Sequence, residues 1–530
     1  MAEIRVGGLS PWTVRLLSLV AGAAAAFAHP PWGFLPGLAG YALLLWLLGL
    51  GGAHRPLRSV FLTGWLAGCA YFLVCVWWIA EPFEVDAANQ GWMAPFAVAA
   101  MTMGLALFWG CAAVAFRMVT SGDRRSGSIA RVMVFAGVFG AAEWLRGHVF
   151  TGFPWDLVGE SWRAGSAPSQ TAAVVGAYGL TWITLAISSA PAVVHDGSRG
   201  RLTVVAAIGA LFAIFVFGAA RLGGAPTGVG GAPVVRVVQA DVKQESKYDP
   251  AIFSSIVARY VRLTARRVSP RPDIVVWPEG AIPAAMGDYL APGTWTLEAI
   301  EAALSPGQVL ILGGYRIANG DASPPVIFNS LVVLRRNTRG IALEGLYDKY
   351  RLVPFGEFLP FDALAARLGI KTLVHVGDGF TPGPPPRPLS LPGLQTFQPL
   401  ICYEAMYPGL AQSGARAAGV RASWIVNISN DAWFGSTSGP WQSLNMAGYR
   451  AIEEGLPMVR ATPTGVSAIV DAFGRIAPRA RLGQGAFGVI DAPLPPALTA
   501  TPFSRTGDLP FAAMLLLSLL AAAPWRWARS

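Results

Sequence analysis

The chain has 530 residues, more than a typical single domain, so two or more structural units are expected. Hydrophobic residues make up 53 % of the sequence and charged residues only 13 %, whereas soluble domains have about 25 % charged residues, which excludes an entirely soluble protein. The net charge of +10 does not predict nucleic-acid binding, because the arginines of the apolar half lie in short loops between apolar runs, where membrane topology explains them.

Seven apolar runs lie before residue 221, each with the roughly 20 residues that a membrane-spanning helix needs. Their centres are near Val20, Leu44, Tyr71, Met103, Val138, Leu180 and Ala210. An eighth run, "PFAAMLLLSLLAAAPW", lies near the end of the sequence. Three of the four cysteines fall inside these runs, so a disulfide framework is not expected. We expect residues 1–221 to form a seven-helix membrane region and residues 508–530 an eighth transmembrane helix with a short cytoplasmic tail.

Arginines occur at every second crossing, and such basic loops belong in the cytoplasm. They are Arg5, Arg15, Arg55, Arg58, Arg117, Arg124, Arg125, Arg131, Arg199, Arg201, Arg526 and Arg529. The intervening loops are neutral, mixed or acidic, as in "EPFEVDAANQ". The pattern predicts cytoplasmic termini and an external segment between spans seven and eight. The string "GAAAAFAHP" resembles a signal-peptidase site, but cleavage there would leave the large segment external as well.

The segment 232–500 alternates β-rich runs with amphipathic stretches of helix length, which is typical of an α/β domain. Two of the helical stretches are residues 254–268 and 444–454. At about 270 residues the segment can bury its own core. The β-rich runs are "VVRVVQA", "DIVVWPE", "QVLILGG", "NSLVVLR", "PLICYE", "ASWIVNIS", "MVRATPTGVSAIVD" and "GAFGVID".

This external segment offers few of the groups used in familiar kinds of catalysis. Its one histidine, His375, has no nucleophile signature beside it and is expected to be structural. No HExxH, CxxC or His/Cys cluster indicates a metal, and no GxxxxGK[ST] or strand-linked GxGxxG indicates a nucleotide. We therefore expect neither a metal nor a cofactor.

Three other side chains together supply a base, a cation and a nucleophile. Glu279 ends the run "DIVVWPE" and can act as a desolvated base, or it is an exposed loop acid. Lys349, in "LYDKYRLVPFGEFLP", can stabilise an oxyanion, or it is a solvated lysine. Cys402 follows the apolar run "FQPLI", where α/β folds place functional side chains, although a buried filler thiol is the plainer interpretation of that stretch alone.

The order of Glu279, Lys349 and Cys402, with the strings "WPE" and "CYE", resembles the nitrilase superfamily, whose Glu–Lys–Cys triad acts on acyl groups in an α-β-β-α sandwich. The strings "DKYRLVPFGEFLP", "PLICYEAMYP" and "ISNDAWFG" further resemble the apolipoprotein N-acyltransferase family, as does "EWLRGHVFTGFPW" in the membrane region. The resemblance covers nearly the whole chain. It implies a bacterial inner-membrane protein of eight spans, with a nitrilase-like catalytic domain at residues 232–500 that faces the periplasm.

The resemblance implies a ping-pong transfer through a thioester on Cys402, with Glu279 as the base and Lys349 stabilising the oxyanion. The acyl chain would come from a phospholipid, with position sn-1 of phosphatidylethanolamine as the expected source. It would pass to the α-amino group of the diacylglyceryl-cysteine at an apolipoprotein N-terminus. The chain is expected to act as a monomer. A membrane-tethered amidase or hydrolase with the same triad is one alternative. A receptor or transporter with an inert sandwich is another, disfavoured by the intact triad.

Supporting roles are implied for residues near the triad, with ordinary structural bonding or core packing as the alternative. Glu357 and Glu404 are candidates for orienting Lys349 or tuning Cys402. The candidates for positioning or for lining the acyl channel and its lids are Asn329, Tyr403, Trp433, Phe358 and Tyr248. In the membrane region, Glu143 and Arg146 are expected to pair structurally. The sequence departs from the family pattern at Gly280, Ser443, Gly448 and Pro463, where threonine, histidine, arginine and asparagine are usual.

Overall fold

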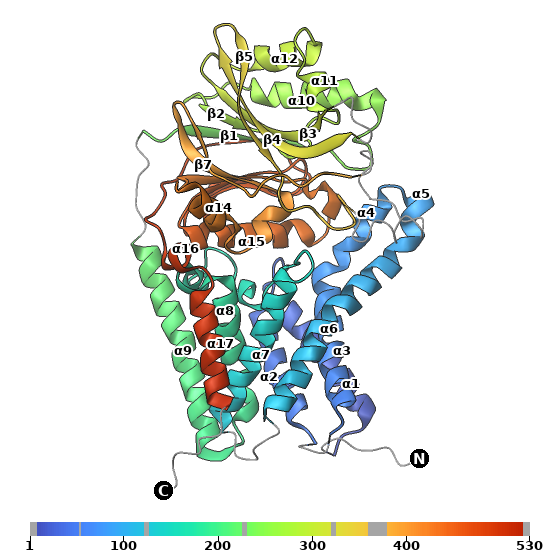
Figure 1. Cartoon of the computed structure of the whole chain (residues 1–530), viewed down its shortest axis with the longest axis vertical. Coiled ribbons are helices and arrows are strands. Elements are labelled where there is room, and N and C mark those ends of the chain that lie inside the picture. The colour runs from blue at the N-terminus through green and yellow to red at the C-terminus, as the bar shows by residue number, and fades with distance from the viewer. Residues whose placement is uncertain are drawn as a thin grey trace. The chain divides into compact units, whose positions relative to one another are not determined.

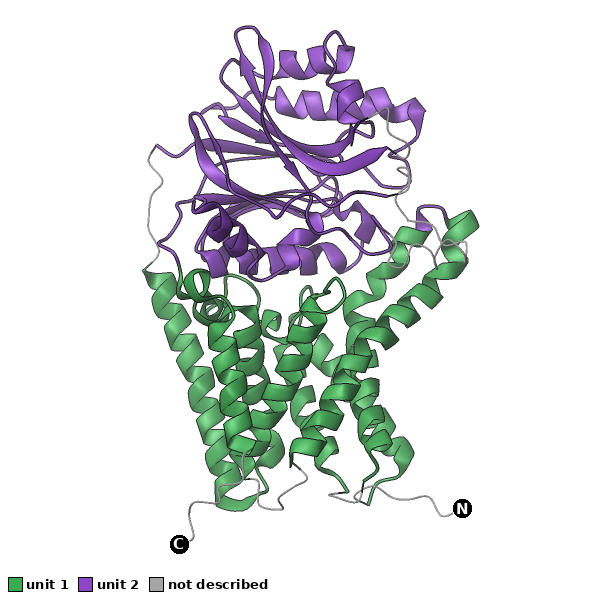
Figure 2. Ribbon diagram, viewed as in Figure 1, with its two compact units in different colours: residues 1–83, 87–225, 501–530 green, residues 84–86, 226–500 purple. Residues whose placement is uncertain are grey.

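The computed structural model describes residues 8–51, 55–120, 127–224, 231–319, 325–358 and 379–522. His375 and the arginines at positions 5, 124, 125, 526 and 529 lie outside these ranges. The chain divides into two compact units, shown in green and purple in Figure 2. Unit 1 comprises residues 1–83, 87–225 and 501–530, and unit 2 comprises residues 84–86 and 226–500.

Unit 1 is built from helices (Figure 1). Its α-helices are α1 (Pro11–Ala26), α2 (Ala39–Gly49), α3 (Leu57–Val76), α4 (Glu81–Glu84), α5 (Ala87–Gln90), α6 (Ala94–Thr120), α7 (Ser128–His148), α8 (Ala172–Ser189), α9 (Gly197–Gly223), α16 (Pro502–Thr506) and α17 (Leu509–Ala522). All seven predicted span centres before residue 221 lie within helices of this set.

Five helical stretches of the described residues are long and apolar enough to cross a membrane. They are Leu57–Glu84, Ala87–Thr120, Ser128–His148, Pro168–Val193 and Gly197–Gly223. The apolar helices at the predicted first, second and eighth spans are shorter. An apolar helical region is therefore established, while the count of eight spans stays a prediction.

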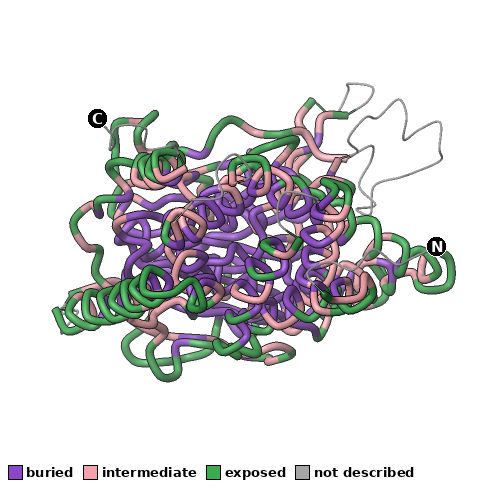
Figure 3. The backbone as a smooth tube through the Cα atoms, turned by 90° about the horizontal axis from the view of Figure 1, so that it is seen from below, coloured by how far each residue is buried: buried purple, intermediate pink, exposed green. Residues whose placement is uncertain are grey.

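The helices of unit 1 turn large apolar side chains outward. Phe212 on α9 is 69 % exposed and Leu519 on α17 is 62 % exposed. Figure 3 colours the backbone by burial, with buried residues in purple and exposed residues in green. Apolar side chains that face outward from several helices are typical of surfaces in contact with lipid.

The interior of unit 1 holds a buried ion pair between Glu143 and Arg146 on α7. Arg146 also donates to the carbonyl oxygens of Phe153, at 2.5 Å, and Trp155, at 2.9 Å. Trp109 donates to the Glu143 carboxylate at 2.9 Å. The motif "EWLRGHVFTGFPW" therefore folds the segment after α7 back onto the helix, which is the structural pairing expected from the sequence.

Unit 2 contains strands and helices in alternation. The strands are β1 (Val234–Ala240), β2 (Ile274–Val276), β3 (Val309–Ala318), β4 (Val326–Asn337), β5 (Gly340–Asp348), β6 (Leu389–Leu391), β7 (Leu394–Ile401), β8 (Trp424–Ile428), β9 (Met458–Ala461), β10 (Ser467–Val470), β11 (Ile476–Leu482) and β12 (Phe487–Pro493). The α-helices are α10 (Phe253–Thr264), α11 (Met286–Tyr289), α12 (Trp295–Ala303), α14 (Leu410–Ala418) and α15 (Gly439–Glu454).

In the described residues these strands form two six-stranded sheets, in the orders β12-β1-β2-β3-β4-β5 and β11-β10-β9-β8-β7-β6. One hydrophobic core lies between the sheets and includes Val237, Ile311 and Val426. A second core packs α10 onto the first sheet and includes Val238 and Tyr260. Val237 and Val238 enter opposite cores because successive side chains of a strand point to opposite faces. Figure 1 shows α10 and α12 over the first sheet and α14 and α15 over the second, which is the α-β-β-α sandwich.

Every predicted β-rich run contains at least part of a strand, and "MVRATPTGVSAIVD" contains two, β9 and β10. The two predicted helical stretches overlap α10 and α15. The sequence did not predict β5, β6 or β11. In all three, few residues are fully buried, so they lack the continuous apolar runs of the central strands.

Candidate active site

Three predicted site residues lie just beyond the ends of strands. Glu279 follows β2, Lys349 directly follows β5, and Cys402 directly follows β7. The neighbouring strand β3 carries Gly313, where a Cβ atom would lie 2.5 Å from Ile428 Cδ1 and 2.7 Å from the Cα atom of Glu279. A glycine at that position lets the Glu279 segment and β8, from different sheets, approach each other.

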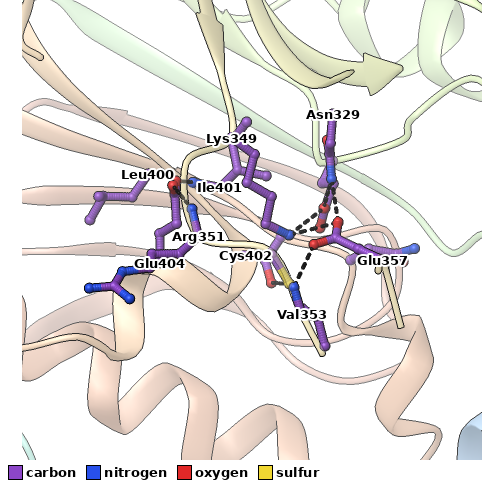
Figure 4. Close-up of polar contacts among 12 residues, drawn as sticks. Asn329, Lys349, Arg351, Val353, Glu357, Leu400, Ile401, Cys402 and Glu404 are labelled. Carbon is purple, nitrogen blue, oxygen red and sulfur yellow. Dashed lines mark hydrogen bonds and ion pairs between the residues drawn. The ribbon is translucent and has the colours of Figure 1, made fainter. Parts of the chain in front are cut away.

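Lys349, Asn329 and Glu357 lie together in a buried hydrogen-bond network (Figure 4), and Glu279 belongs to the same network. Lys349 Nζ lies 3.4 Å from Glu279 Oε1 and 2.9 Å from Glu357 Oε1. Asn329 Nδ2 donates to the same two oxygens, at 2.6 Å and 2.8 Å. Glu357 Oε2 accepts the backbone N–H of Val353 at 2.9 Å. Of the sequence candidates, Asn329 and Glu357 are therefore in direct contact with this pair.

The network keeps both partners of the pair charged. Burial opposes ionisation of Glu279, but the Lys349 ammonium and the Asn329 amide outweigh it, so the pKa of Glu279 lies below its usual value. Burial also opposes the charge on Lys349, and the carboxylates of Glu279 and Glu357 raise the pKa of Lys349 above its usual value. Glu279 Oε2 is buried and has no hydrogen-bond partner among the described residues, so it is free to accept a proton.

Cys402 begins a short 3-10 helix, Cys402–Met406, directly after β7. Its φ angle is +49°, a left-handed conformation that a non-glycine residue adopts at a cost of about 1–3 kcal/mol and that often marks a functional site. Ser429 Oγ, at the end of β8, donates to Cys402 Sγ at 3.4 Å. The parallel strands β7 and β8 thus bring their carboxyl ends, and these two side chains, together.

The thiol of Cys402 is protonated at rest. Burial and the nearby Glu279 carboxylate raise the pKa of Cys402 to about 12. The pKa is lowered, to a smaller extent, by Lys349, the Ser429 hydroxyl and the backbone N–H of Asn430. A thiol with so high a pKa becomes a nucleophile only when a base takes its proton, and Glu279 is the ionised acceptor beside it.

Glu404 is buried, but it bonds to neither Lys349 nor Cys402. Its carboxylate accepts the backbone N–H groups of Tyr350, at 2.8 Å, Arg351, at 3.1 Å, and Ile401, at 2.7 Å. The Tyr347 hydroxyl donates to it at 2.6 Å. Glu404 therefore connects the segment that carries Lys349 to the end of β7 that carries Cys402.

The aromatic candidates occupy different settings. Tyr403 is buried and its ring lies 5.2 Å from that of Tyr407, in an edge-to-face arrangement. Trp433 and Phe358 are partly buried, and Tyr248 is 50 % exposed. No hydrogen bond places any of the last three on the triad in the part of the chain that the structure describes.

Several polar residues near the nucleophile were not singled out in the sequence. The guanidinium of Arg460, fully buried on β9, contacts Asp431 at 2.7 Å and the Ser443 hydroxyl at 2.8 Å. The Ser429 hydroxyl lies 2.7 Å from Asp431 Oδ1, so its single proton is shared between two acceptors, this carboxylate and the sulfur of Cys402. An arginine inside the apolar run "MVRA" was the available signal, because a charge within a buried strand requires partners. Ser443, one of the departures from the family pattern, thus has a hydrogen-bonding role here.

The structure also describes the surroundings of the other three residues that depart from the family pattern. Gly448 is buried on α15. The carbonyl oxygen of Pro463 accepts the backbone N–H of Val242 at 3.3 Å. Gly280 has a φ angle of +57°, a conformation that favours glycine. Across the described residues, no group of three or more His, Cys, Asp or Glu side chains is suited to hold a metal ion.

Comparisons with known proteins agree with this geometry. The family model described as carbon-nitrogen hydrolase matches residues 231–502, and the model of the apolipoprotein N-acyltransferase N-terminal domain matches residues 21–190. An apolipoprotein N-acyltransferase from Caulobacter vibrioides is 54 % identical over 97 % of this chain and 95 % of its own length. The chain belongs to the apolipoprotein N-acyltransferase family. It is therefore an acyltransferase and a membrane enzyme, and the amidase or hydrolase alternative is less well supported.

More distant relatives also match nearly the whole length of this chain. The apolipoprotein N-acyltransferases of Bradyrhizobium diazoefficiens and Brucella melitensis are 35 % and 37 % identical, over 98 % and 97 % of this chain and 96 % of their own lengths. Among solved structures, a nitrilase-superfamily amidase from Nesterenkonia AN1 matches 54 % of this chain and 98 % of its own, at 17 % identity and a TM-score of 0.36. That structural likeness is too distant to bear on activity.

Proposed function

We propose that this apolipoprotein N-acyltransferase works through a thioester on Cys402, with Glu279 as the general base and Lys349 as the oxyanion-stabilising cation. The observation that supports these roles is the buried arrangement around Glu279. One oxygen of its carboxylate is bonded to Asn329 and close to Lys349, while the other has no partner among the described residues. Such a carboxylate is held in place and still has one oxygen available for a proton.

The first half-reaction transfers the acyl chain to the enzyme. Glu279 takes the thiol proton as Cys402 Sγ attacks the ester carbonyl of a phospholipid, at position sn-1 of phosphatidylethanolamine. The negative charge that leaves sulfur develops on the carbonyl oxygen, where the ammonium of Lys349 stabilises it. The intermediate collapses, the C–O ester bond breaks, and Glu279 returns its proton to the departing lysophospholipid alkoxide. The products are a Cys402 thioester and a lysophospholipid.

The second half-reaction passes the acyl chain to the acceptor. The neutral α-amino group of a diacylglyceryl-cysteine attacks the thioester carbonyl, and Lys349 again stabilises the oxyanion. The C–S bond breaks, the thiolate of Cys402 is reprotonated, and Glu279 relays the proton that the amine loses. The product is an amide at the N-terminus of the lipoprotein. Since water would hydrolyse the thioester, an apolar and closable pocket is required, for which Trp433, Phe358 and Tyr248 are the lining candidates.

The proposal extends to the organisation of the chain. In this proposal the protein lies in the bacterial inner membrane, where residues 1–221 form a seven-helix membrane region. Residues 232–500 form a periplasmic catalytic domain, and residues 508–530 form the eighth span and a cytoplasmic tail. Both termini are cytoplasmic, and the chain works as a monomer. The support is the alternation of basic loops and the outward-facing apolar side chains of unit 1.

Labelled phosphatidylethanolamine, given to the purified protein without an acceptor, tests the thioester. We expect label on Cys402 that hydroxylamine removes, that a diacylglyceryl peptide discharges as an amide, and that is absent in Cys402→Ala. Release of free fatty acid at one rate, with or without the peptide, would instead establish a hydrolase. Normal lipoprotein maturation in a Cys402→Ala strain would exclude the thioester route.

A further inference from the structure

Lys247, on the segment between β1 and α10, is a second buried cation close to the triad. Its side chain is 2 % exposed. Among the described residues, no carboxylate lies within 4.0 Å of its ammonium and no hydrogen bond uses it; the Tyr248 ring, 5.8 Å away, is the contact that the ammonium has. An ammonium that is largely removed from water and faces no carboxylate is costly, and an anionic ligand would offset that cost.

The position of this ammonium relative to Glu279 is given by Gly280. A Cβ atom built on Gly280 would lie 2.7 Å from Lys247 Nζ. The ammonium therefore lies against the backbone of the residue that follows the proposed base. A side chain at position 280 would enter the space that the ammonium occupies.

A second buried polar group lies on the same segment. Gln244 is 3 % exposed, and its Oε1 atom accepts from Asn430 Nδ2 at 3.1 Å. Its Nε2 atom is buried and has no partner within 3.5 Å among the described residues. The Gln244 side chain also interacts with the Tyr248 hydroxyl, where burial raises the pKa of Tyr248 and this interaction acts to lower it. Asn430 is the residue whose backbone N–H faces the sulfur of Cys402. The segment 244–247 thus presents two buried donors, an ammonium and an amide, beside the residues that flank the nucleophile and the base.

We propose that Lys247 and Gln244 form an anion subsite that receives the phosphodiester of the acyl donor. The proposal rests on the proposed function, because it assigns a role within the first half-reaction. A phosphodiester carries one negative charge and two oxygens that accept hydrogen bonds, which matches one ammonium and one amide donor. In a glycerophospholipid this group is attached to the same glycerol unit as the reacting ester, so its subsite must adjoin the triad.

The charges around Lys247 also favour a phosphodiester as the ligand of this subsite. Lys349 is already paired with two carboxylates, Glu279 and Glu357, whereas Lys247 is paired with neither. Burial lowers the pKa of Lys247 to about 8, and the charge of Glu279 acts in the opposite direction. Binding of an anion would raise the pKa of Lys247 again and offset the free-energy cost of removing its ammonium from water. A donor without phosphate, such as diacylglycerol, offers no such compensation.

The test compares two acyl donors with identical chains, phosphatidylethanolamine and diacylglycerol, in single-turnover acylation of Cys402 by the full-length protein. Lys247→Met should slow acylation by the phospholipid about tenfold to a hundredfold, and leave the diacylglycerol reaction unchanged. Lys247→Arg, which keeps the charge, should retain most of the phospholipid preference. Lys243→Met is the matched control, because Lys243 is exposed on the same segment and should have no effect.

Inorganic phosphate should compete with the phospholipid in the parent protein, and inhibition that persists in Lys247→Met would place the anion elsewhere. An equal slowing of both donors by Lys247→Met would overturn the subsite. Failure of either donor to acylate the parent protein would instead overturn the proposed function.

Discussion

At the scale of single residues, the proposed site depends on a thiol that is kept protonated. Burial and the Glu279 carboxylate raise the pKa of Cys402 to about 12, while Lys349 and Ser429 oppose this rise. At neutral pH the thiolate is therefore scarce, and sulfur becomes reactive only when a bound ester allows its charge to move onto an oxyanion. Because a protonated thiol is a weak nucleophile, Cys402 reacts slowly with other electrophiles as long as no lipid is bound.

Glu279→Gln should separate catalysis from intrinsic thiol reactivity. The substitution removes the base, so thioester formation from phospholipid should fall by about 100-fold or more. It also removes the negative charge that raises the pKa of Cys402, so alkylation of Cys402 by iodoacetamide at pH 8 should become faster than in the parent. Peptide mass spectrometry resolves Cys402 from the other three cysteines. Slower alkylation in Glu279→Gln would contradict the proposed electrostatics.

Ser429→Ala should slow the alkylation of Cys402, which is the opposite of the effect expected for Glu279→Gln. The hydroxyl of Ser429 donates to the sulfur at 3.4 Å and favours the thiolate. Without it the pKa of Cys402 should rise further, alkylation at pH 8 should slow, and thioester formation should fall about tenfold. Ser390→Ala, at an exposed serine on β6 that bonds Thr396, is the control and should leave both rates unchanged. Equal alkylation rates in Ser429→Ala and the parent would show that this hydroxyl does not tune the thiol.

At the scale of elements, the site is assembled from strand ends that distant parts of the sequence supply. Glu404 joins two of them, because it holds backbone N–H groups at residues 350 and 351, after β5, and at Ile401 on β7. A carboxylate that accepts several backbone donors in a buried place is costly to alter. Its contribution is therefore to the relative placement of Lys349 and Cys402, which it does not itself touch.

Glu404→Gln should consequently destabilise the catalytic domain and slow acylation together. The new amide group would face backbone donors, so at least one hydrogen bond is replaced by a donor–donor clash that costs about 2–4 kcal/mol. Thermal unfolding in detergent and single-turnover acylation are the measurements. Glu344→Gln is the matched control, because Glu344 forms a partly exposed ion pair with Arg335 and should change stability by less than about 1 kcal/mol. An unchanged melting temperature in Glu404→Gln would refute this structural role.

Particular elements explain what the sequence could and could not predict. The strand β2 is an apolar run that ends shortly before Glu279, and β7 ends in the apolar residues Leu400 and Ile401 directly before Cys402, so both strand ends were predictable. The strand before Lys349, β5, contains Glu344 and Gly345 and is mostly part-buried, so periodicity did not reveal it. Lys247 lies in the polar stretch "DVKQESKYDP", which is typical of an exposed loop, and only the tertiary fold buries it. Local sequence indicates strand ends well, but it does not show which polar residues the fold brings to them.

At the scale of the whole molecule, the helices of unit 1 carry two kinds of information. Their outward-facing apolar side chains indicate contact with lipid, and five stretches in the described residues are long and apolar enough to span it. The buried pair of Glu143 and Arg146 holds the segment after α7 against that helix, which is a structural role. These features favour a membrane enzyme over a receptor or transporter.

The orientation of the chain is the remaining prediction at this scale, and it rests on the basic loops. Arginines attract loops to the cytoplasmic side, so a reporter that is active only outside the membrane should work when fused near Asp249, and one active only inside should work near Arg124. Replacing the arginines at 124 and 125 with glutamine should weaken the second signal without inverting the first, because the other cytoplasmic loops keep their charge. The reverse pattern in the parent chain would place Cys402 in the cytoplasm. Acylation of lipoproteins on the outer side of the membrane would then require a different enzyme.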